Sequence, residues 1–132
     1  MKVTADTNVL VRAVTGDHLD QSKVAKATLR GAELVAIPIP ALCELVWVLS
    51  RGYKHASSDI AEAIRRFTNG ANAVVDRPAV EAGLAILDAG GDFADGVIAY
   101  EGNWLGADTF VSFDRRAVKL LEAQGKSARL LP

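Results

Sequence analysis

ELVAIPIPALCELVWVLSRGY, residues 33–53, places a strand directly before a helix, and this succession indicates the class of fold. Residues 33–38 are apolar after the first position and end at a proline, which is typical of a short buried strand. Residues 40–53 begin with Pro40, which is favoured in the first turn of a helix, and carry Gly52 near their end. The segment therefore predicts a strand–helix unit, with one carboxylate, Glu44, in the middle of an apolar helix.

The alternation of strands and helices continues on both sides of this segment. Further strands are predicted over residues 2–6, 72–76, 108–114 and 127–132, and further helices over residues 7–16, 21–31, 57–70, 77–91, 92–106 and 115–125. Strands that alternate with helices predict an α/β domain with a mostly parallel sheet. The chain contains no repeat, low-complexity segment or long linker, so we expect residues 1–132 to form a single domain.

The composition is ordinary for a globular domain. Of the 132 residues, 50% are hydrophobic and 23% are charged, and the formal net charge of −1 does not indicate a broad basic surface. The one cysteine, Cys43, cannot form an internal disulfide, which is compatible with a reducing compartment. The sequence shows neither a signal peptide nor an apolar run that could span a membrane, so we expect a soluble, cytoplasmic protein without a membrane partner.

Five carboxylates fall where a parallel α/β sheet binds its ligands, at or beyond the carboxyl ends of the strands. Asp6 ends the first predicted strand, and Asp114 ends the fourth. Asp92 and Asp95 open the helix 92–106, and Glu44 lies one turn into the helix that follows the second strand. We therefore expect these groups to converge at one rim of the sheet.

Carboxylates that are packed together repel each other unless a cation joins them. Mg²⁺ and Mn²⁺ are hard ions that take carboxylate and water ligands and also bind phosphate oxygens. A bound metal of this kind activates a water and neutralises charge on the phosphate. A cluster of carboxylates at the sheet rim therefore indicates metal-assisted hydrolysis of a phosphodiester.

Each carboxylate also has a purely structural interpretation. Asp6 is as compatible with a helix N-cap as with a metal ligand, and Asp114 taken alone favours the cap. For Asp92 the cap is favoured too, whereas Asp95, inside the first turn, favours the ligand. Glu44 has the weakest structural interpretation, because exposure to solvent is hard to arrange within ALCELVWVL and a buried unpaired carboxylate is costly. We therefore expect Glu44 to serve the site.

Other classes of protein require residues or motifs that this chain lacks. His18 and His55 lie in polar turns and are not expected to act as catalytic bases, and the P-loop, CxxC and HExxH motifs are absent. A haloacid-dehalogenase-like phosphatase is one alternative, but it needs a second aspartate where Asn8 stands. A catalytically silent module that only binds RNA or a protein partner is another, and the intact set of carboxylates argues against it.

Four blocks of the sequence resemble the PIN-domain ribonucleases, and among them the VapC toxins of bacterial toxin–antitoxin pairs. The blocks are ADTNVLV (5–11), ALCELVWVL (41–49), DFADGVIA (92–99) and FVSFDRR (110–116), which together span almost the whole chain. The resemblance implies a PIN-like α/β/α sandwich with a central sheet of four or five strands. It also implies an endoribonuclease that depends on Mg²⁺ or Mn²⁺, forms a homodimer and is inhibited by a VapB-like antitoxin.

Carried over residue by residue, the resemblance implies an acidic site whose residues are both catalytic and metal-binding. These are Asp6, Glu44, Asp95 and Asp114, with Asp92 as an additional candidate ligand and with Asn8 and Ser112 in supporting positions. Two features depart from the family pattern. Gly96 stands where alanine is more usual, and two arginines follow Asp114 where many members have a loop with an aromatic residue. Neither departure removes a ligand.

Two further expectations concern the partners. Arg12, Arg115 and Arg116 are equally compatible with contacts to RNA phosphates and with solvated surface charges. The predicted helix 40–53 carries a set of large apolar side chains, more than a small domain is expected to cover. An exposed apolar patch usually marks an interface. This set consists of Val46, Trp47, Leu49 and Tyr53. We expect it to serve a homodimer, with an antitoxin helix in a groove near residues 41–53.

Overall fold

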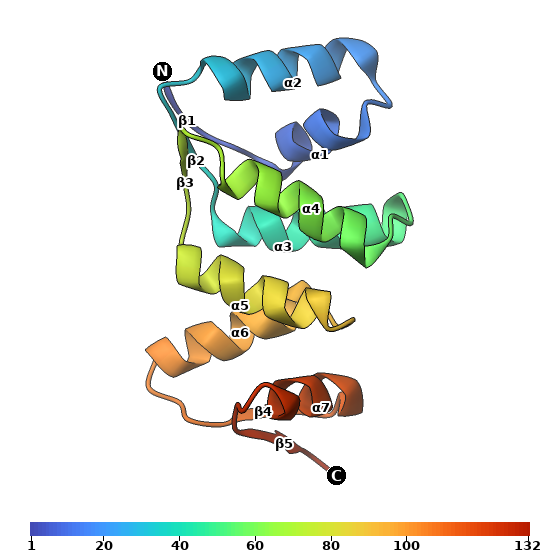
Figure 1. Ribbon diagram of the computed structural model, residues 1–132, viewed down its shortest axis with the longest axis vertical. Helices are drawn as coiled ribbons and strands as arrows, with labels where there is room; N and C mark the ends of the chain where they lie inside the picture. Colours follow the sequence, from blue (N-terminus) through green and yellow to red (C-terminus); the bar gives the residue numbers. More distant parts are fainter. The chain divides into compact units, whose positions relative to one another are not determined.

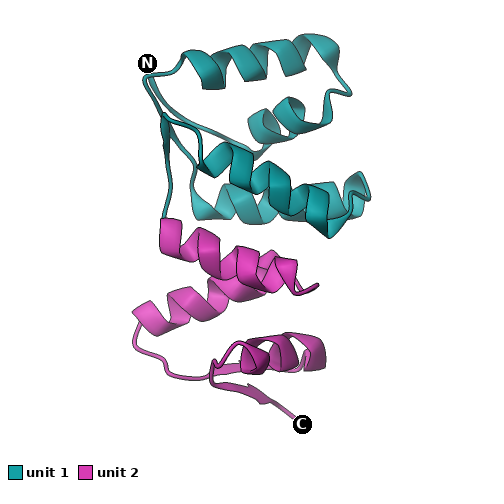
Figure 2. Ribbon diagram, in the orientation of Figure 1, with its two compact units in different colours: residues 1–76 teal, residues 77–132 magenta.

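The chain forms two units in the computed structural model, which describes residues 1–132: unit 1 is Met1–Asp76 and unit 2 is Arg77–Pro132 (Figure 2). The strands of unit 1 are β1 (Lys2–Thr4), β2 (Leu34–Ala36) and β3 (Ala73–Val74), and those of unit 2 are β4 (Phe110–Ser112) and β5 (Ala128–Leu130). All neighbouring strands are parallel. The predicted α/β class with a parallel sheet is therefore confirmed, and the five strands are divided into a sheet of three and a sheet of two.

The sheet of unit 1 has the order β1-β2-β3, with β2 in the middle (Figure 1). Val35, the buried centre of β2, is opposite Val3 of β1 and Ala73 of β3. Parallel neighbours need a crossover connection, and both crossovers are helical here. The first consists of α1 (Thr7–Thr15) and α2 (Leu19–Gly31), and the second of α3 (Ile39–Trp47), a π-helical turn η1 (Val48–Gly52) and α4 (Ser57–Thr68).

The helix predicted over residues 40–53 corresponds to α3 and η1, and one face of it forms part of the core of unit 1. The core residues on this face are Leu42, Leu45, Val46 and Leu49, each at most 5% exposed and spaced as one side of a helix requires. The prediction that Val46 and Leu49 belong to an uncovered apolar surface is therefore wrong. Of that set, Trp47 is 64% exposed and Tyr53 is half-buried.

Glu44 lies on the opposite face of α3 and is exposed. The exposed residues Pro40, Glu44, Trp47 and Arg51 follow one another at spacings of three and four, which places them along one side of the helix. Solvent exposure was expected to be hard to arrange within ALCELVWVL, and for Glu44 this expectation is wrong. The number of apolar residues in a helix does not decide which side faces water; the angular position around the axis does.

Unit 2 begins with two helices in contact, α5 (Arg77–Asp88) and α6 (Phe93–Trp104), and continues with β4, α7 (Arg115–Ala123) and β5. Gly96 of α6 lies against the backbone of α5, because a Cβ atom at this position would be 2.2 Å from the carbonyl oxygen of Ala82. Gly83 of α5 is covered by the ring of Phe93, which is fully buried. Glycine in place of the more usual alanine at position 96 therefore permits a close approach of the two backbones.

The predicted helices and strands are all present, and their ends differ from the prediction by a few residues. The helix expected from residue 21 begins at Leu19, where Nδ1 of His18 accepts a hydrogen bond from the N–H of Gln21 at 3.2 Å. Gly16 follows α1 with a φ of 65°, a left-handed conformation that glycine adopts without strain. No helix of the chain is long and apolar enough to cross a membrane.

Candidate metal centre

Asp6 and Glu44, the two candidate ligands of unit 1, both bind Thr7. Asp6 lies just beyond β1, whose pairing with β2 continues through a hydrogen bond from the N–H of Ala5 to the carbonyl oxygen of Ala36 at 2.9 Å. As the N-cap of α1, Asp6 accepts a hydrogen bond at Oδ1 from the N–H of Thr7 at 2.9 Å. The hydroxyl of the same threonine donates to Oε2 of Glu44 at 3.4 Å. The carboxyl end of β1 thus brings both carboxylates to one buried threonine.

Asp92, Asp95 and Asp114, the three candidate ligands of unit 2, are all at the beginnings of helices. Asp92 is the N-cap of α6 and accepts a hydrogen bond at Oδ1 from a backbone N–H of that helix at 3.2 Å. Asp95 follows in the first turn of α6 and is half-buried. Asp114 is the N-cap of α7, and its Oδ1 accepts two backbone N–H groups at 3.0 and 3.2 Å. The cap interpretation is therefore confirmed for Asp92 and Asp114, as it is for Asp6.

Asp95 is a carboxylate of unit 2 whose pKa is affected by its surroundings. Partial burial raises the pKa of Asp95, and the negative charges of Asp92 and Asp114 raise this pKa further. None of the three forms an ion pair with a lysine or an arginine. Carboxylate oxygens that repel each other and have no cationic partner suit a hard divalent ion such as Mg²⁺ or Mn²⁺.

The residues expected to support the site occupy different kinds of position. Ser112, at the end of β4, accepts a hydrogen bond at Oγ from the N–H of Asp114 at 2.9 Å, which fixes the backbone from which this carboxylate projects. Asn8 is exposed in the first turn of α1. Arg115 and Arg116 are exposed and are the first two residues of α7.

Arg12 binds side chains within unit 1. Its Nη1 lies 3.0 Å from Oδ1 of Asp17, and its Nε donates to Oε1 of Gln21 at 2.7 Å. Asp17 also accepts hydrogen bonds from the hydroxyls of Tyr53, at 2.6 Å, and Thr15, at 2.8 Å. The bond from Tyr53 is the largest of the effects that lower the pKa of Asp17, followed by the bond from Thr15 and the smaller contribution of Arg12. Arg12 is thus part of a network that joins the turn after α1 to the residue that follows η1.

The five candidate ligands are shared between the units, two in unit 1 and three in unit 2. Within neither unit do three or more histidine, cysteine, aspartate or glutamate side chains lie close enough together to hold a metal ion. Each unit therefore carries a part of the set that was expected at one rim. In each part the carboxylates lie at the start of a helix or, for Glu44, beside the start of another helix. All the candidate ligand atoms are oxygens.

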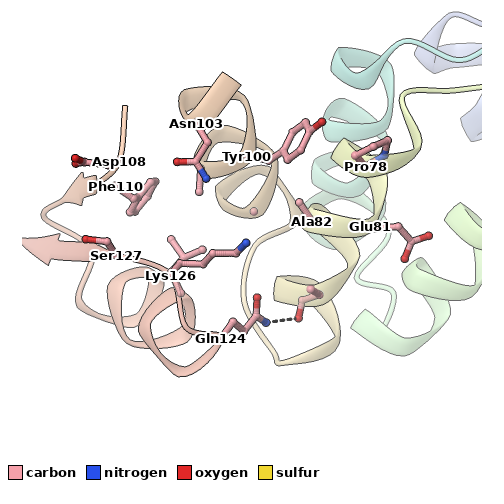
Figure 3. Close-up of a pocket in the computed structure, with 14 residues that line it drawn as sticks. Pro78, Glu81, Ala82, Tyr100, Asn103, Asp108, Phe110, Gln124, Lys126 and Ser127 are labelled. Carbon is pink, nitrogen blue, oxygen red and sulfur yellow. Dashed lines mark hydrogen bonds between the residues drawn. The ribbon is translucent and has the colours of Figure 1, made fainter. Parts of the chain in front are cut away.

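A pocket of about 320 Å³ in unit 2 is lined by other residues (Figure 3). Tyr100 and Asn103 of α6 and Lys126, in the segment before β5, are among its lining side chains. On its wall, Gln124 donates a hydrogen bond from Nε2 to the carbonyl oxygen of Ala85 at 2.9 Å. None of the candidate carboxylates lines this pocket, so it is not part of the candidate metal centre.

Thr7 is a site residue that reasoning from the sequence missed. Its burial and its two hydrogen bonds make it the link between Asp6 and Glu44. A signal was available, because Thr7 follows Asp6 directly and is the first residue of a helix. Its side-chain partner, however, lies 37 positions away in the sequence, and no local pattern indicates such a pair.

Comparison with known families agrees with the fold. Residues 3–122 match the family model of the PIN domain, and the chain therefore belongs to the PIN-domain family. Members of this family are generally nucleases that use divalent metals. No curated protein matches the chain.

Proposed function

We propose that this protein is an endoribonuclease that depends on Mg²⁺ or Mn²⁺. Its catalytic residues are the metal ligands Asp6, Glu44, Asp95 and Asp114, with Asp92 as an additional ligand. The observation that carries the proposal is the position of the three carboxylates of unit 2, which lie at the starts of two helices without a cationic partner. Membership of a family that generally consists of nucleases supports the same conclusion.

The proposed reaction is the hydrolysis of an RNA phosphodiester by water. A divalent cation would lower the pKa of that water and neutralise charge on the phosphate. Asp6, Asp92 and Asp114 each use Oδ1 for a helix cap, so Oδ2 of each side chain can bind a cation while the cap is kept. Thr7 restricts the orientation of the exposed Glu44 carboxylate through its hydroxyl. Hydrogen bonds thus orient four of the five carboxylates in the absence of a cation.

The alternatives raised by the sequence have less support. A haloacid-dehalogenase-like phosphatase is not favoured, because the chain belongs to the PIN-domain family and Asn8 stands where that phosphatase needs an aspartate. A silent module that only binds RNA or a protein has no need for carboxylates that repel each other. The complete candidate set therefore favours the enzyme.

We further propose that the protein is a cytoplasmic VapC-type toxin, active as a homodimer and inhibited by a VapB-like antitoxin. The four sequence blocks that resemble these toxins support this role, and PIN domains are often found in toxin–antitoxin systems. Trp47, which is 64% exposed on the same side of α3 as Glu44, is the large apolar side chain of this helix that remains for a partner. For RNA phosphates, Arg115 and Arg116 are better placed than Arg12, which already binds Asp17 and Gln21.

The enzymatic proposal is tested with purified protein and labelled single-stranded RNA. We expect cleavage in Mg²⁺ or Mn²⁺, no cleavage in EDTA, and loss of cleavage in Asp95→Asn and Asp114→Asn, which keep the shapes of the side chains. Glu101→Gln removes an exposed carboxylate of α6 outside the candidate set and is the matched control. Cleavage that persists in EDTA or in both aspartate variants would contradict the proposal.

The toxin proposal needs separate measurements. Expression of the chain should arrest growth of the host cell, and co-expression of a small protein encoded next to it should restore growth. Asp114→Asn should be harmless when expressed, because the arrest depends on cleavage. Sedimentation at micromolar concentration tests the homodimer, and a monomer would refute it. An adjacent small protein that neither binds the chain nor restores growth would refute the antitoxin.

A further inference from the structure

The turn between α5 and α6 contains a glycine that makes room for an arginine. Gly90 has a φ of +93°, which other residues rarely adopt, and Nη2 of Arg116 lies 3.0 Å from the position that a Cβ atom of residue 90 would occupy. Any side chain at position 90 would therefore meet the guanidinium group. The absence of a side chain lets Arg116 lie directly against the backbone of this turn.

Arg116 makes no ion pair, although carboxylates are close to it in the sequence on both sides of this contact. Asp92 follows Gly90 by two residues, and Asp114 precedes Arg116 by two. The contact between Arg116 and Asp114 is made by the backbone, whose N–H donates to Oδ1 of the aspartate at 3.0 Å. The guanidinium itself pairs with neither carboxylate. An exposed, unpaired guanidinium of α7 thus lies against the turn that precedes α6.

Arg116 differs in this respect from Arg12, the candidate RNA contact of unit 1. Arg12 uses Nε and Nη1 for Gln21 and Asp17, whereas the N–H groups of the Arg116 guanidinium are left without a protein acceptor. A guanidinium group binds phosphate through two parallel hydrogen bonds, and this geometry requires a fixed orientation. Contact with the backbone at Gly90 limits the directions in which this exposed guanidinium can point.

We propose that Arg116, held by Gly90, binds a phosphate of the RNA next to the one that is cut. This inference rests on the proposed function and assigns the substrate contact to one side chain and its glycine support. Because Arg116 follows the cap residue Asp114 by two positions, a phosphate bound there belongs to the nucleotides nearest the metal ligands. Arg116 contributes to substrate binding, and the chemistry of water attack does not involve it.

The first test removes the charge. Binding of a fluorescent single-stranded oligoribonucleotide of mixed sequence is followed by anisotropy in EDTA, where cleavage is absent. Arg116→Gln should weaken binding roughly five- to tenfold and reduce the slope of log affinity against log salt concentration by about 0.7, the value for one lost phosphate contact on a single strand. Arg129→Gln, which removes an exposed arginine of β5, is the matched control and should change neither quantity.

The second test removes the support and leaves the charge. Gly90→Asn introduces a side chain that tolerates positive φ and displaces the guanidinium, and it should weaken RNA binding in the same direction as Arg116→Gln. Gly106→Asn is its control, because Gly106 has a φ of +104° and no atom lies within 4 Å of the place that its Cβ atom would take. The double variant Gly90→Asn/Arg116→Gln should bind no more weakly than Arg116→Gln, since the glycine acts only through the arginine.

Cleavage kinetics complete the test and separate the two proposals. In Mn²⁺, Arg116→Gln should raise KM and leave kcat nearly unchanged, as expected for a group that binds substrate and transition state equally. If the parent cleaves RNA in Mn²⁺ but Arg116→Gln and Gly90→Asn bind RNA as the parent does, this inference is overturned and the nuclease proposal stands. If the parent neither binds nor cleaves RNA, both are overturned. Additive losses in the double variant would also overturn the role given to Gly90.

Discussion

Thr7 and Glu44 are joined by a hydrogen bond of 3.4 Å from the threonine hydroxyl to Oε2 of the carboxylate, although 37 positions separate them in the sequence. The same threonine donates its backbone N–H to Asp6. One buried residue at the start of α1 therefore restrains two candidate metal ligands at once. Groups that orient metal ligands in this way usually matter for metal affinity.

Replacement of Thr7 by valine should weaken metal use more than stability. Thr7→Val removes the hydroxyl but keeps the backbone N–H that Asp6 accepts, and the exposed Glu44 can bind water instead. We expect the Mn²⁺ concentration for half-maximal RNA cleavage to rise roughly tenfold, with unfolding free energy changed by less than about 1 kcal/mol. Thr4→Val, at an exposed strand position, is the control. An unchanged Mn²⁺ requirement would show that the bond has no role in the site.

Replacement of Glu44 by glutamine should have little effect on the apoprotein. Glutamine can still accept the hydrogen bond from Thr7, and the position is exposed, so in EDTA the unfolding free energy should stay within about 0.5 kcal/mol of the parent. In millimolar Mn²⁺ the parent should melt at a higher temperature than the variant, because ligand-linked stability requires the carboxylate. Thermal melts in both conditions decide the question. A variant that is clearly destabilised in EDTA would show that Glu44 stabilises the folded state and is not there only for the metal.

Asp95 should make the apoprotein less stable as pH rises. Burial and the charges of Asp92 and Asp114 raise its pKa, so the folded state binds this proton more tightly than the unfolded state does. Above about pH 4, where an unfolded aspartate ionises, the parent should lose stability until the folded carboxyl is ionised as well. Asp95→Asn should lack this loss. Chemical unfolding in EDTA from acid to neutral pH measures it, and equal pH profiles would exclude the effect.

The bond between Tyr53 and Asp17 gives a pH dependence of the opposite sign. It lowers the pKa of Asp17, so this carboxylate contributes stability at neutral pH that is lost as pH falls through its folded pKa. Tyr53→Phe should move the pKa of Asp17 upward and reduce that loss in acid. Titration of the Asp17 carboxyl by NMR measures the shift. An unchanged or lower pKa in the variant would contradict the assignment, and Thr15→Val should give a smaller upward shift.

Gly96 should be required for the contact of α5 with α6. A methyl group there would lie 2.2 Å from the carbonyl oxygen of Ala82, so Gly96→Ala should cost about 2–3 kcal/mol of unfolding free energy through overpacking. Gly102→Ala in the same helix has nothing within 4 Å and should stabilise the protein by about 0.5–1 kcal/mol. Urea unfolding of the two variants measures both effects. A neutral Gly96→Ala would mean that the helices can separate without cost.

The order of strands and helices could be read from the sequence, because apolar spacing, prolines and glycines are local signals. The strand–helix succession of residues 33–53 was predicted in this way and is present as β2, α3 and η1. The sequence was less informative about which side chains face solvent. Glu44 and Trp47 face solvent whereas Val46 and Leu49 are buried, since the elements that pack against the helix decide which of its sides is buried.

The candidate site was predictable as a set of carboxylates but not as a set of contacts. Asp6, Asp92 and Asp114 follow strands or turns and precede helices, which is visible in the sequence and explains why the structure shows them as caps. The role of Thr7 depends on a side chain from another element, and the position of the Arg116 guanidinium depends on a glycine in the turn between two other helices. Such pairs are set by tertiary packing, on which short sequence patterns carry no information.

The capping aspartates have a consequence for how inactive variants of this protein should be made. Asp6, Asp92 and Asp114 each hold the first turn of a helix through Oδ1, so an alanine scan would shorten or loosen three helices while it removes three ligands. A loss of about 1 kcal/mol per cap would then be mistaken for a loss of catalysis. Asparagine caps helices as well as aspartate does and lacks the charge, so it separates the two duties of these side chains.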